Sequence, residues 1–395
     1  MKTHSPLRIV VLGYLVRGPL GGIAWHHLQY VVGLAQLGHN VCFIEDSDDF
    51  PSCYDPARNV TDADPGYGLR FAHDAFARLG LPDRWAYFDA HRNVWRGPAG
   101  RRGPEICAAA DIVLNLSCVT PLRSWFEHVP VRVLVDTDPV FTQVRHLQKP
   151  DARRMAADHT AFFSFGERIG QPDCTIPPDG FPWAPTRQPL VLDAWTPSIG
   201  DPGGPLTSVM LWGSYAPVQH EGTLYGMKAQ SFDPFMTLPR RCTERFELAM
   251  GSDEEPRRQL ESRGWTVTDP RDATRDPWTY QRFIARSKAE FSVAKHGYVI
   301  SRSGWFSERS LSYLASGRPV IVQDTAFPQE LRRSRGILAF STAEEALMQI
   351  AALNEDYEGR CRDARAVAEE YFAAGEVLSQ LLAAATSPQA GALAH

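Results

Sequence analysis

The sequence predicts an α/β protein with two Rossmann-like, doubly wound domains that face each other across a cleft. The length of 395 residues fits two domains of ordinary size. Segments typical of buried strands alternate with helical segments twice along the chain, which indicates parallel sheets covered by helices. A proline-rich stretch, residues 172–205, separates the two alternations. Because ligands of such sheets bind beyond the carboxyl ends of the strands, the cleft between the domains is the expected site.

The first alternation begins with a β-branched apolar run, Leu7–Leu12, which predicts a buried strand. A glycine-rich turn over residues 18–22 follows it, and apolar residues then recur at helical spacing until Gly38 ends the helix. Four further runs predict strands: Val41–Ile44, Asp111–Leu116, Val131–Val135 and Ala161–Phe165. We assign these elements to an N-terminal domain, residues 1–190.

The proline-rich stretch cannot form regular helix or central strand, because proline lacks the amide hydrogen that both require. We place a linker at residues 191–206 and a C-terminal domain at residues 207–367. Its expected strands are Ser208–Trp212, Phe246–Met250, Trp265–Thr268, Ala289–Ala294 and Pro319–Gln323, and its expected helices are Glu254–Arg263, Pro277–Arg286 and Phe306–Ala315. The pattern from Thr342 to Ala385 is almost wholly helical.

Composition narrows the classes of function. Hydrophobic residues make up 44% and charged residues 22%, close to the globular average, so wholesale disorder is excluded. The net charge of −5 leaves no basic excess to neutralise a nucleic-acid backbone, so we expect no nucleic-acid partner. The longest early apolar stretch, Ile9–Val16, is far shorter than a membrane span, and we expect neither such a span nor a signal peptide. The seven scattered cysteines show no zinc-ligand spacing, which predicts reduced thiols and a cytoplasmic location.

The glycine turn is a candidate anion site. Gly21 and Gly22 allow the backbone to approach a phosphate, and the helix that follows supplies free N–H groups. The spacing matches neither the dinucleotide fingerprint nor a P-loop, and a plain strand-to-helix turn is the alternative. His26 and His27 lie near the start of this helix, where a histidine facing the cleft would be a general base for an acceptor hydroxyl or thiol. A packing or capping role is the alternative for each.

Two carboxylates follow the predicted strand Val131–Val135. Asp136 and Asp138 stand at the strand end, where sites in parallel sheets form. They are candidates for binding a sugar, orienting a histidine or acting as base, and turn formation or helix capping is the alternative. Two aspartates without other obvious ligands do not make a metal site, so we predict no metal.

The segment from Lys295 to Ser312 carries the densest set of candidate donor-binding residues. Lys295, Arg302 and the amides of residues 303–306 are candidates to hold a diphosphate. Glu308 is a candidate to accept hydrogen bonds from ribose hydroxyls, with stabilisation of the helix dipole as the alternative. The remaining candidates for donor binding are Ser303, Gly304, Trp305 and Ser312, together with Gly213 and Ser214 after the strand Ser208–Trp212.

Two segments resemble the large retaining family of glycosyltransferases with the GT-B fold. One is Gly21-Gly22-x3-His26 with Gly38-His39-x-Val41, which is similar to that family's first strand–helix unit. The other, Leu314–Ile321, resembles the family's Met-Ala-x-Gly-x-Pro-Val-Val segment. The resemblance implies metal-independent transfer of a sugar from a nucleotide-sugar on the C-terminal domain to an acceptor on the N-terminal domain. It also implies that the final helix, residues 368–390, crosses back onto the N-terminal domain.

The chain departs from that family at positions that carry its chemistry. The family's paired glutamates, which have seven residues between them, align with Gly304 and Ser312, which leaves Glu308 to bind ribose. The family's arginine after the first C-terminal strand aligns near residues 213–214. Three cationic residues are candidates to replace its charge: Lys228, Lys295 and Arg302. An inverting displacement, with one of the histidine or aspartate candidates as base, therefore remains open.

The sequence thus predicts a glycosyltransferase that moves a sugar from a nucleotide-sugar to a small-molecule acceptor, at a hydroxyl or another nucleophile. A tailoring enzyme of secondary metabolism fits; the nucleotide-sugar is a co-substrate, no cofactor is expected, and a homodimer is left open. Two alternatives remain. A sugar-nucleotide epimerase of the same fold would turn over the donor without an acceptor. A catalytically silent sugar-nucleotide-binding protein would fit the missing glutamate pair.

Overall fold

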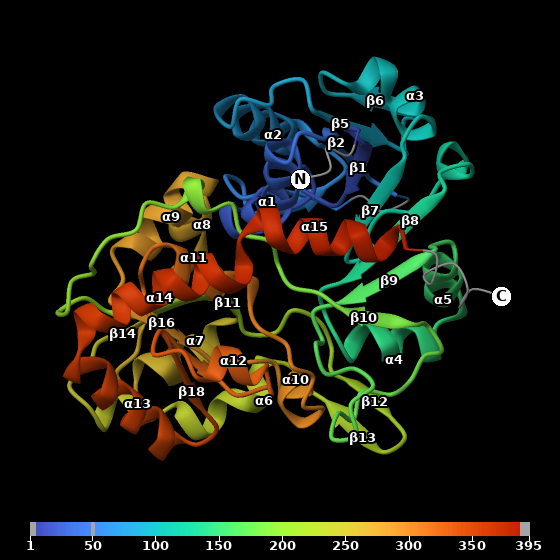
Figure 1. Ribbon diagram of the computed structural model, residues 1–395. Helices are drawn as coiled ribbons and strands as arrows, with labels where there is room; N and C mark the ends of the chain where they lie inside the picture. Colours follow the sequence, from blue (N-terminus) through green and yellow to red (C-terminus); the bar gives the residue numbers. More distant parts are fainter. Residues whose placement is uncertain (1–4, 49–51, 388–395) are drawn as a thin grey trace.

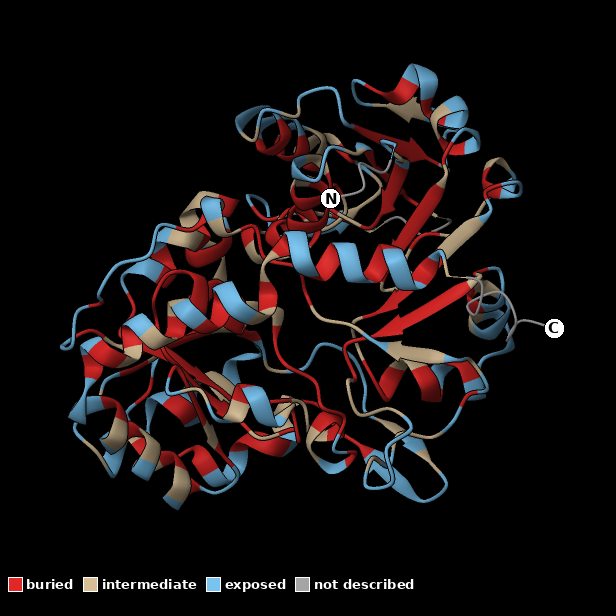
Figure 2. Cartoon of the chain, viewed as in Figure 1, coloured by how far each residue is buried: buried red, intermediate tan, exposed pale blue. Residues whose placement is uncertain are grey.

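The computed structural model describes residues 5–48 and 52–387, which form two α/β domains side by side (Figure 1). Each domain has its own sheet, and the central strands are buried along most of their length (Figure 2). Along the first strand, Ile9 and Val11 belong to one apolar core while Val10 and Leu12 belong to another. Both faces of the sheet are therefore covered, which explains why this strand is a continuous apolar run.

The N-terminal domain is built on an eight-stranded sheet in the order β10-β9-β8-β7-β1-β2-β5-β6. All neighbouring strands are parallel except the edge pair β5–β6. The strands are β1 (Arg8–Leu12), β2 (Asn40–Asp46), β5 (Trp85–Asp89), β6 (Val94–Arg96), β7 (Ile112–Leu116), β8 (Val131–Asp136), β9 (Ala161–Ser164) and β10 (Trp183–Pro185). The helices are α1 (Gly21–Gln36), α2 (Gly66–Arg78), α3 (Gly103–Ala108), α4 (Phe141–Gln148) and α5 (Pro150–Ala157). A separate hairpin joins β3 (Cys53–Asp55) and β4 (Val60–Asp62).

The C-terminal domain has a six-stranded, all-parallel sheet in the order β15-β14-β11-β16-β17-β18. Its strands are β11 (Leu206–Leu211), β14 (Phe246–Gly251), β15 (Thr266–Thr268), β16 (Ala289–Ser292), β17 (Val320–Gln323) and β18 (Ile337–Phe340). Its helices are α6 (Lys228–Phe232), α7 (Glu254–Glu261), α8 (Pro270–Thr274), α9 (Pro277–Ala285), α10 (His296–Ile300), α11 (Glu308–Ala315), α12 (Gln329–Arg332), α13 (Ala343–Glu355) and α14 (Tyr357–Phe372). A hairpin of β12 (Val218–His220) and β13 (Thr223–Tyr225) follows β11.

The chain passes between the domains at two adjacent places. Leu190 lies beside the junction of α14 and α15 (Ala374–Ala385): its N–H donates to Phe372 O, and Ala374 N–H donates to Leu190 O, both at 2.8 Å. From this junction α15 runs back across the N-terminal domain (Figure 1). It packs so tightly on α1 that a Cβ at Gly33 would lie 2.7 Å from Leu378 Cδ1. The part of the predicted final helix at 388–390 lies outside the described residues.

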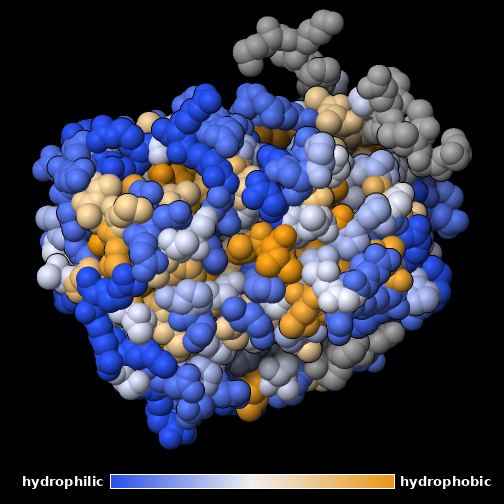
Figure 3. Space-filling model, turned by 90° about the horizontal axis from the view of Figure 1, so that it is seen from below, coloured by the Kyte–Doolittle hydropathy of each residue, from blue (hydrophilic) through white to orange (hydrophobic). Residues whose placement is uncertain are grey.

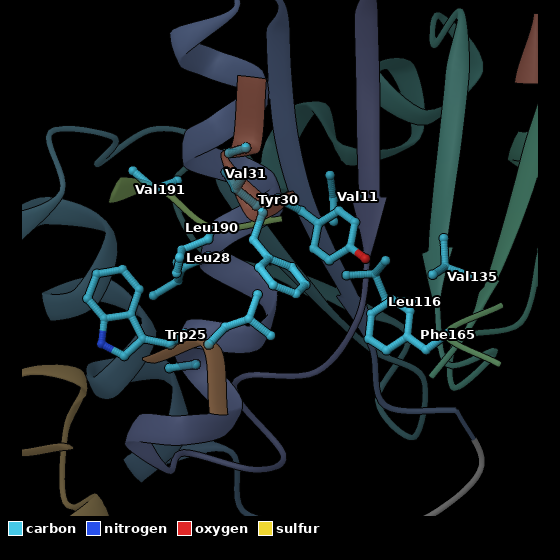
Figure 4. Close-up of a cluster of buried hydrophobic side chains, with 14 of the residues drawn as sticks. Val11, Trp25, Leu28, Tyr30, Val31, Leu116, Val135, Phe165, Leu190 and Val191 are labelled. Carbon is cyan, nitrogen blue, oxygen red and sulfur yellow. The ribbon is translucent and has the colours of Figure 1, made fainter. Parts of the chain in front are cut away.

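The linker adds apolar side chains to the same contact. Leu190 and Val191 lie close to Trp25 and Leu28 of α1 (Figure 4). The first strand–helix unit, the linker and α15 therefore share one core, which connects the domains at one end of the cleft.

The structure confirms each predicted strand to within two residues at either end. The sequence reading missed β5, β6, β10, β18 and both hairpins. β5 (WAYFD) contains no β-branched residue, and β18 is a four-residue run between a turn and a helix, so neither carries a clear strand signal. β10 lies at a sheet edge, where its proline removes no hydrogen bond that a neighbour needs.

On the face seen in Figure 3, hydrophilic residues predominate, and apolar areas lie among them near the middle of the face. Within 5–48 and 52–387, no helix combines the length and apolar character needed to cross a bilayer. All seven cysteines are free thiols.

Candidate functional site

The carboxyl ends of both sheets open onto one cavity of about 930 Å³ between the domains. The N-terminal domain contributes α1, the segments after β7 and β8, and the β3–β4 hairpin. The C-terminal domain contributes the segments after β11, β14 and β16 and the start of α11. Parallel sheets place the ends of all these strands at the same edge, so residues far apart in the sequence meet here.

A buried ammonium group lies at the wall of this cavity. Lys228 is the first residue of α6, and its Nζ is buried without a hydrogen-bond partner among the described residues. Burial and the positive charge of Arg309 hold the pKa of Lys228 well below its usual range, against the pull of Glu290 and Glu308. An uncompensated buried cation is costly, and such groups are typically matched by an anion.

A second cation beside it is held rigidly. Arg309, in the first turn of α11, donates from Nε to Glu290 Oε1 and from Nη2 to Ser292 Oγ, each at 2.8 Å. Glu290 belongs to β16 and is fully buried. Burial opposes the charge of Arg309, but Glu290 and Glu308 raise its pKa, so the guanidinium stays protonated. The sheet thus fixes this cation at the cavity wall.

The N-terminus of α11 faces the same space. Ser307 caps it, with its Oγ accepting from Arg309 N at 3.2 Å. Trp305, Glu308 and Ser312 all line the cavity. No hydrogen bond or ion pair of the Glu308 carboxylate occurs among the described residues, although the group is only half-exposed. The site therefore combines two basic side chains, a helix N-terminus with its free N–H groups and one unpaired carboxylate.

Lys295 joins the two domains across the cleft. Its Nζ donates to Asp138 Oδ1 at 2.8 Å and to Tyr215 Oη at 3.0 Å, and it lies over the rings of Phe141, Tyr215 and Tyr298. The hydroxyls of Tyr215 and Tyr298 also donate to Asp138. Asp138 and Lys295 are both predicted site residues. They meet at the cavity, where they form an ion pair with each other.

The two predicted histidines have different surroundings. His26 lines the cavity, and its Nδ1 is buried without a hydrogen-bond partner among the described residues. Burial lowers the pKa of His26, while Glu308 opposes that change. His27 instead points into the protein: its Nδ1 lies 2.8 Å from Ile23 O, and Tyr14 N–H donates to its Nε2. It is fully buried and does not line the cavity, so the prediction of His27 as a cleft-facing base is corrected to a packing role.

Asp136 is likewise a structural residue. Its carboxylate accepts from Thr142 Oγ1 (2.6 Å), Gln143 Nε2 (3.0 Å), Ser164 Oγ (2.7 Å) and Asp138 N (2.9 Å). Burial raises its pKa, and these hydrogen bonds oppose the rise. Asp136 does not line the cavity, so its predicted catalytic role is replaced by one of fixing the turn after β8.

The glycine turns contribute unequally. Gly22 lines the cavity opposite the Tyr280 ring, whereas a Cβ at Gly21 would lie 2.4 Å from Asp276 O, so Gly21 serves the contact between the domains. After β11, Ser214 lines the cavity and Gly213 does not.

Three further predicted donor-binding residues lie outside the cavity. Arg302 is exposed and pairs with Asp173 at 3.0 Å. Ser303 is fully buried and donates to Tyr298 O at 3.2 Å. Gly304 has a φ of +77° and donates from its N–H to Thr325 O at 2.8 Å. These residues shape the loop before α11 and do not line the cavity.

No protein-family model matches the sequence, and no curated protein matches it either. Solved structures do match. An α-glucosyltransferase in complex with UDP and a 13-mer DNA superposes with a TM-score of 0.60 at 10% identity, over 96% of this chain and 99% of that one. AviGT4, a glycosyltransferase involved in avilamycin A biosynthesis, gives 0.54 at 14% identity, over 96% and 97%. HepE from Anabaena, in complex with UDP-glucose, gives 0.54 at 10% identity, over 95% and 99%.

The chain has the GT-B fold. α15 packs on α1 of the N-terminal domain, whereas residues 368–372, which the sequence prediction placed in the same final helix, belong to α14.

Sequence reasoning missed several residues of the GT-B cleft. Arg309 directly follows Glu308, but helical spacing alone did not show that its side chain turns back to Glu290. Tyr215 and Tyr298 carried no signal, since tyrosines near strand ends are usually packing residues. Among the described residues, no group of three or more His, Cys, Asp or Glu side chains is arranged to hold a metal ion.

Proposed function

We propose that this protein is a glycosyltransferase that uses a nucleotide-sugar donor, whose diphosphate binds between Lys228, Arg309 and the N-terminus of α11. The observation that carries the proposal is the buried Lys228 ammonium, which has no partner among the described residues. A diphosphate supplies the anion that this group lacks, and the amides at the start of α11 are suited to the same oxygens.

This arrangement fits the chemistry of sugar transfer. When the bond from the sugar to the diphosphate breaks, negative charge develops on the leaving oxygen. Cations fixed in a cavity away from bulk water stabilise that charge with little reorganisation. Arg309 is already oriented by Glu290 and Ser292 before any ligand binds. We propose that these cations, and no metal ion, neutralise the leaving group.

The N-terminal side of the cavity suits a small polar acceptor. It is lined by the hydroxyl residues Ser117, Thr137 and Thr142 and by His26 and Arg145. The lowered pKa of His26 keeps its imidazole neutral near pH 7, as a general base must be. We propose a small-molecule acceptor whose nucleophile is deprotonated by His26. The neighbouring structures bound to UDP and UDP-glucose support a nucleotide-sugar donor here.

A thermal-shift screen tests the proposal. The purified protein is heated with UDP, GDP, ADP, CDP or dTDP in EDTA, since a ligand of the folded state raises the melting temperature. We expect a clear rise with one nucleotide in the wild type and little rise in Lys228→Met. Lys149→Met, which changes an exposed lysine outside the cavity, is the matched control. No shift with any nucleotide, or an equal shift in Lys228→Met, would refute the donor site.

A further inference from the structure

Glu308 holds the one carboxylate at the cavity wall whose charge is exposed to the cavity without a direct partner in the described part of the chain. The two other carboxylates at that wall are paired: Asp138 with Lys295, and Asp269 with Arg271. Glu308 lies half-buried at the first position of α11. Stabilisation of the helix dipole is the alternative role of Glu308, because a helix N-terminus favours a negative charge. That role does not explain why the side chain lines the cavity.

Residues of both domains line the cavity at which Glu308 lies. On the C-terminal side its charge acts on Lys228 and Arg309, the two proposed diphosphate ligands. From the N-terminal domain, Tyr14 and His26 line the same cavity: burial raises the pKa of Tyr14 and lowers that of His26, and Glu308 raises both. Lys295 and Asp138 stand at the same cavity, joined to each other. The cavity that Glu308 lines is therefore bounded by the proposed diphosphate ligands on the C-terminal side and by His26 on the proposed acceptor side.

A ribose partner is better sought farther along α11. Ser312 lines the cavity four residues beyond Glu308, which is about 6 Å along a helix. On the proposed placement of the diphosphate at the helix start, a nucleoside that follows α11 past Ser312 leaves the sugar on the side of the N-terminal domain. Glu308 then faces the sugar.

We propose that Glu308 contacts the glycosyl group of the donor and stabilises the positive charge that develops on it during transfer. The inference rests on the function proposed above. In the step, the bond between the anomeric carbon and the diphosphate oxygen breaks, and its electron pair leaves with the diphosphate. The acceptor oxygen bonds to the anomeric carbon, and its proton passes to His26. Glu308 and the Lys228–Arg309 pair thus stabilise opposite charges on the two sides of the breaking bond, as carboxylates do in glycoside hydrolysis.

The Glu308→Gln variant separates this role from ribose binding. A residue that binds ribose contacts the nucleoside diphosphate even when no sugar is attached. Its loss would therefore weaken the complex with that nucleotide. We expect instead an unchanged dissociation constant for the nucleotide selected by the thermal-shift screen. Release of that nucleotide from its glucose ester, with water as acceptor, should fall about 10²–10³-fold. Glu254→Gln, which changes a first-turn glutamate of α7 outside the cavity, is the matched control and should retain both properties.

A binding readout makes the test independent of turnover. The iminosugar 1-deoxynojirimycin is a cationic sugar analogue, and we expect it to bind the wild-type nucleotide complex at least tenfold more tightly than the Glu308→Gln complex. Equal iminosugar affinity in the two proteins, or weaker binding of the free nucleotide to Glu308→Gln, would overturn the inference while leaving the proposed function intact. Failure of every nucleotide to bind the wild type would instead refute the proposed function, and the inference with it.

Discussion

Replacing Lys228 by methionine should change stability and nucleotide binding in opposite directions. The side chain keeps its length, but the ammonium, buried without a partner among the described residues, is removed. Without ligand, the wild type bears the cost of that desolvated charge, so the variant should be more stable. With nucleotide, the wild type gains an ion pair that methionine cannot form.

The expected sizes follow from the burial of Nζ. An unsatisfied buried polar group costs about 1–3 kcal/mol, and more when it is charged. In a domain of this size that corresponds to a rise in melting temperature of roughly 2–10 °C. A hydrogen bond to a charged partner contributes about 1.5–3 kcal/mol, so nucleotide affinity should fall roughly 10- to 150-fold.

The pH dependence has a defined sign. The pKa of Lys228 is lower in the folded protein than in the unfolded chain, so the unfolded chain binds more protons between the two values. The destabilisation caused by burying the Lys228 charge is fully present below the pKa that Lys228 has in the folded protein. It disappears as the pH rises toward the pKa of about 10.4 that lysine has in the unfolded chain. The gap in melting temperature between variant and wild type should therefore narrow between pH 7 and 10.

Differential scanning fluorimetry with and without nucleotide measures both effects, and calorimetry gives the affinity. Lys149→Met again serves as control. A variant that is less stable than the wild type without ligand, yet binds nucleotide equally well, would show that Lys228 is an ordinary packing residue and would refute the reasoning.

Three further predictions concern residues at the edges of the site. Arg302→Ala should leave nucleotide affinity unchanged by calorimetry, because its side chain is exposed outside the cavity; a marked loss would contradict its placement. His26→Ala should lower donor turnover with nucleotide affinity intact, whereas His27→Ala should lower the melting temperature by several degrees because it leaves a void in the core; normal turnover in His26→Ala would remove the proposed base. Asp138→Asn should weaken the bridge to Lys295 by about 1–3 kcal/mol and widen the distribution of domain separations measured by small-angle scattering, and an identical scattering profile would argue against that bridge.

The fold could be predicted because its signals are local. Leu7–Leu12 followed by the glycine turn and an amphipathic helix identifies a strand–helix unit without knowledge of tertiary contacts. β5 and β18 escaped because short apolar runs are ambiguous until their neighbours in the sheet are known.

The site was predictable only in part, for a different physical reason. Sequence position indicates that a residue stands at a strand end but not which way its side chain turns. Asp136 and Asp138 are two residues apart, yet one turns inward to Ser164 and the other reaches Lys295 across the cleft. His26 and His27 diverge in the same manner, since neighbouring helical positions point about 100° apart.

The return of α15 to α1 has a consequence for biosynthesis. Gly33 and its neighbours on α1 are covered by Ala374 and Leu378, residues that leave the ribosome only after the entire C-terminal domain. The usual order, in which an N-terminal domain folds first during translation, therefore cannot be completed here. The cover of α1 is completed only once α15 has been synthesised.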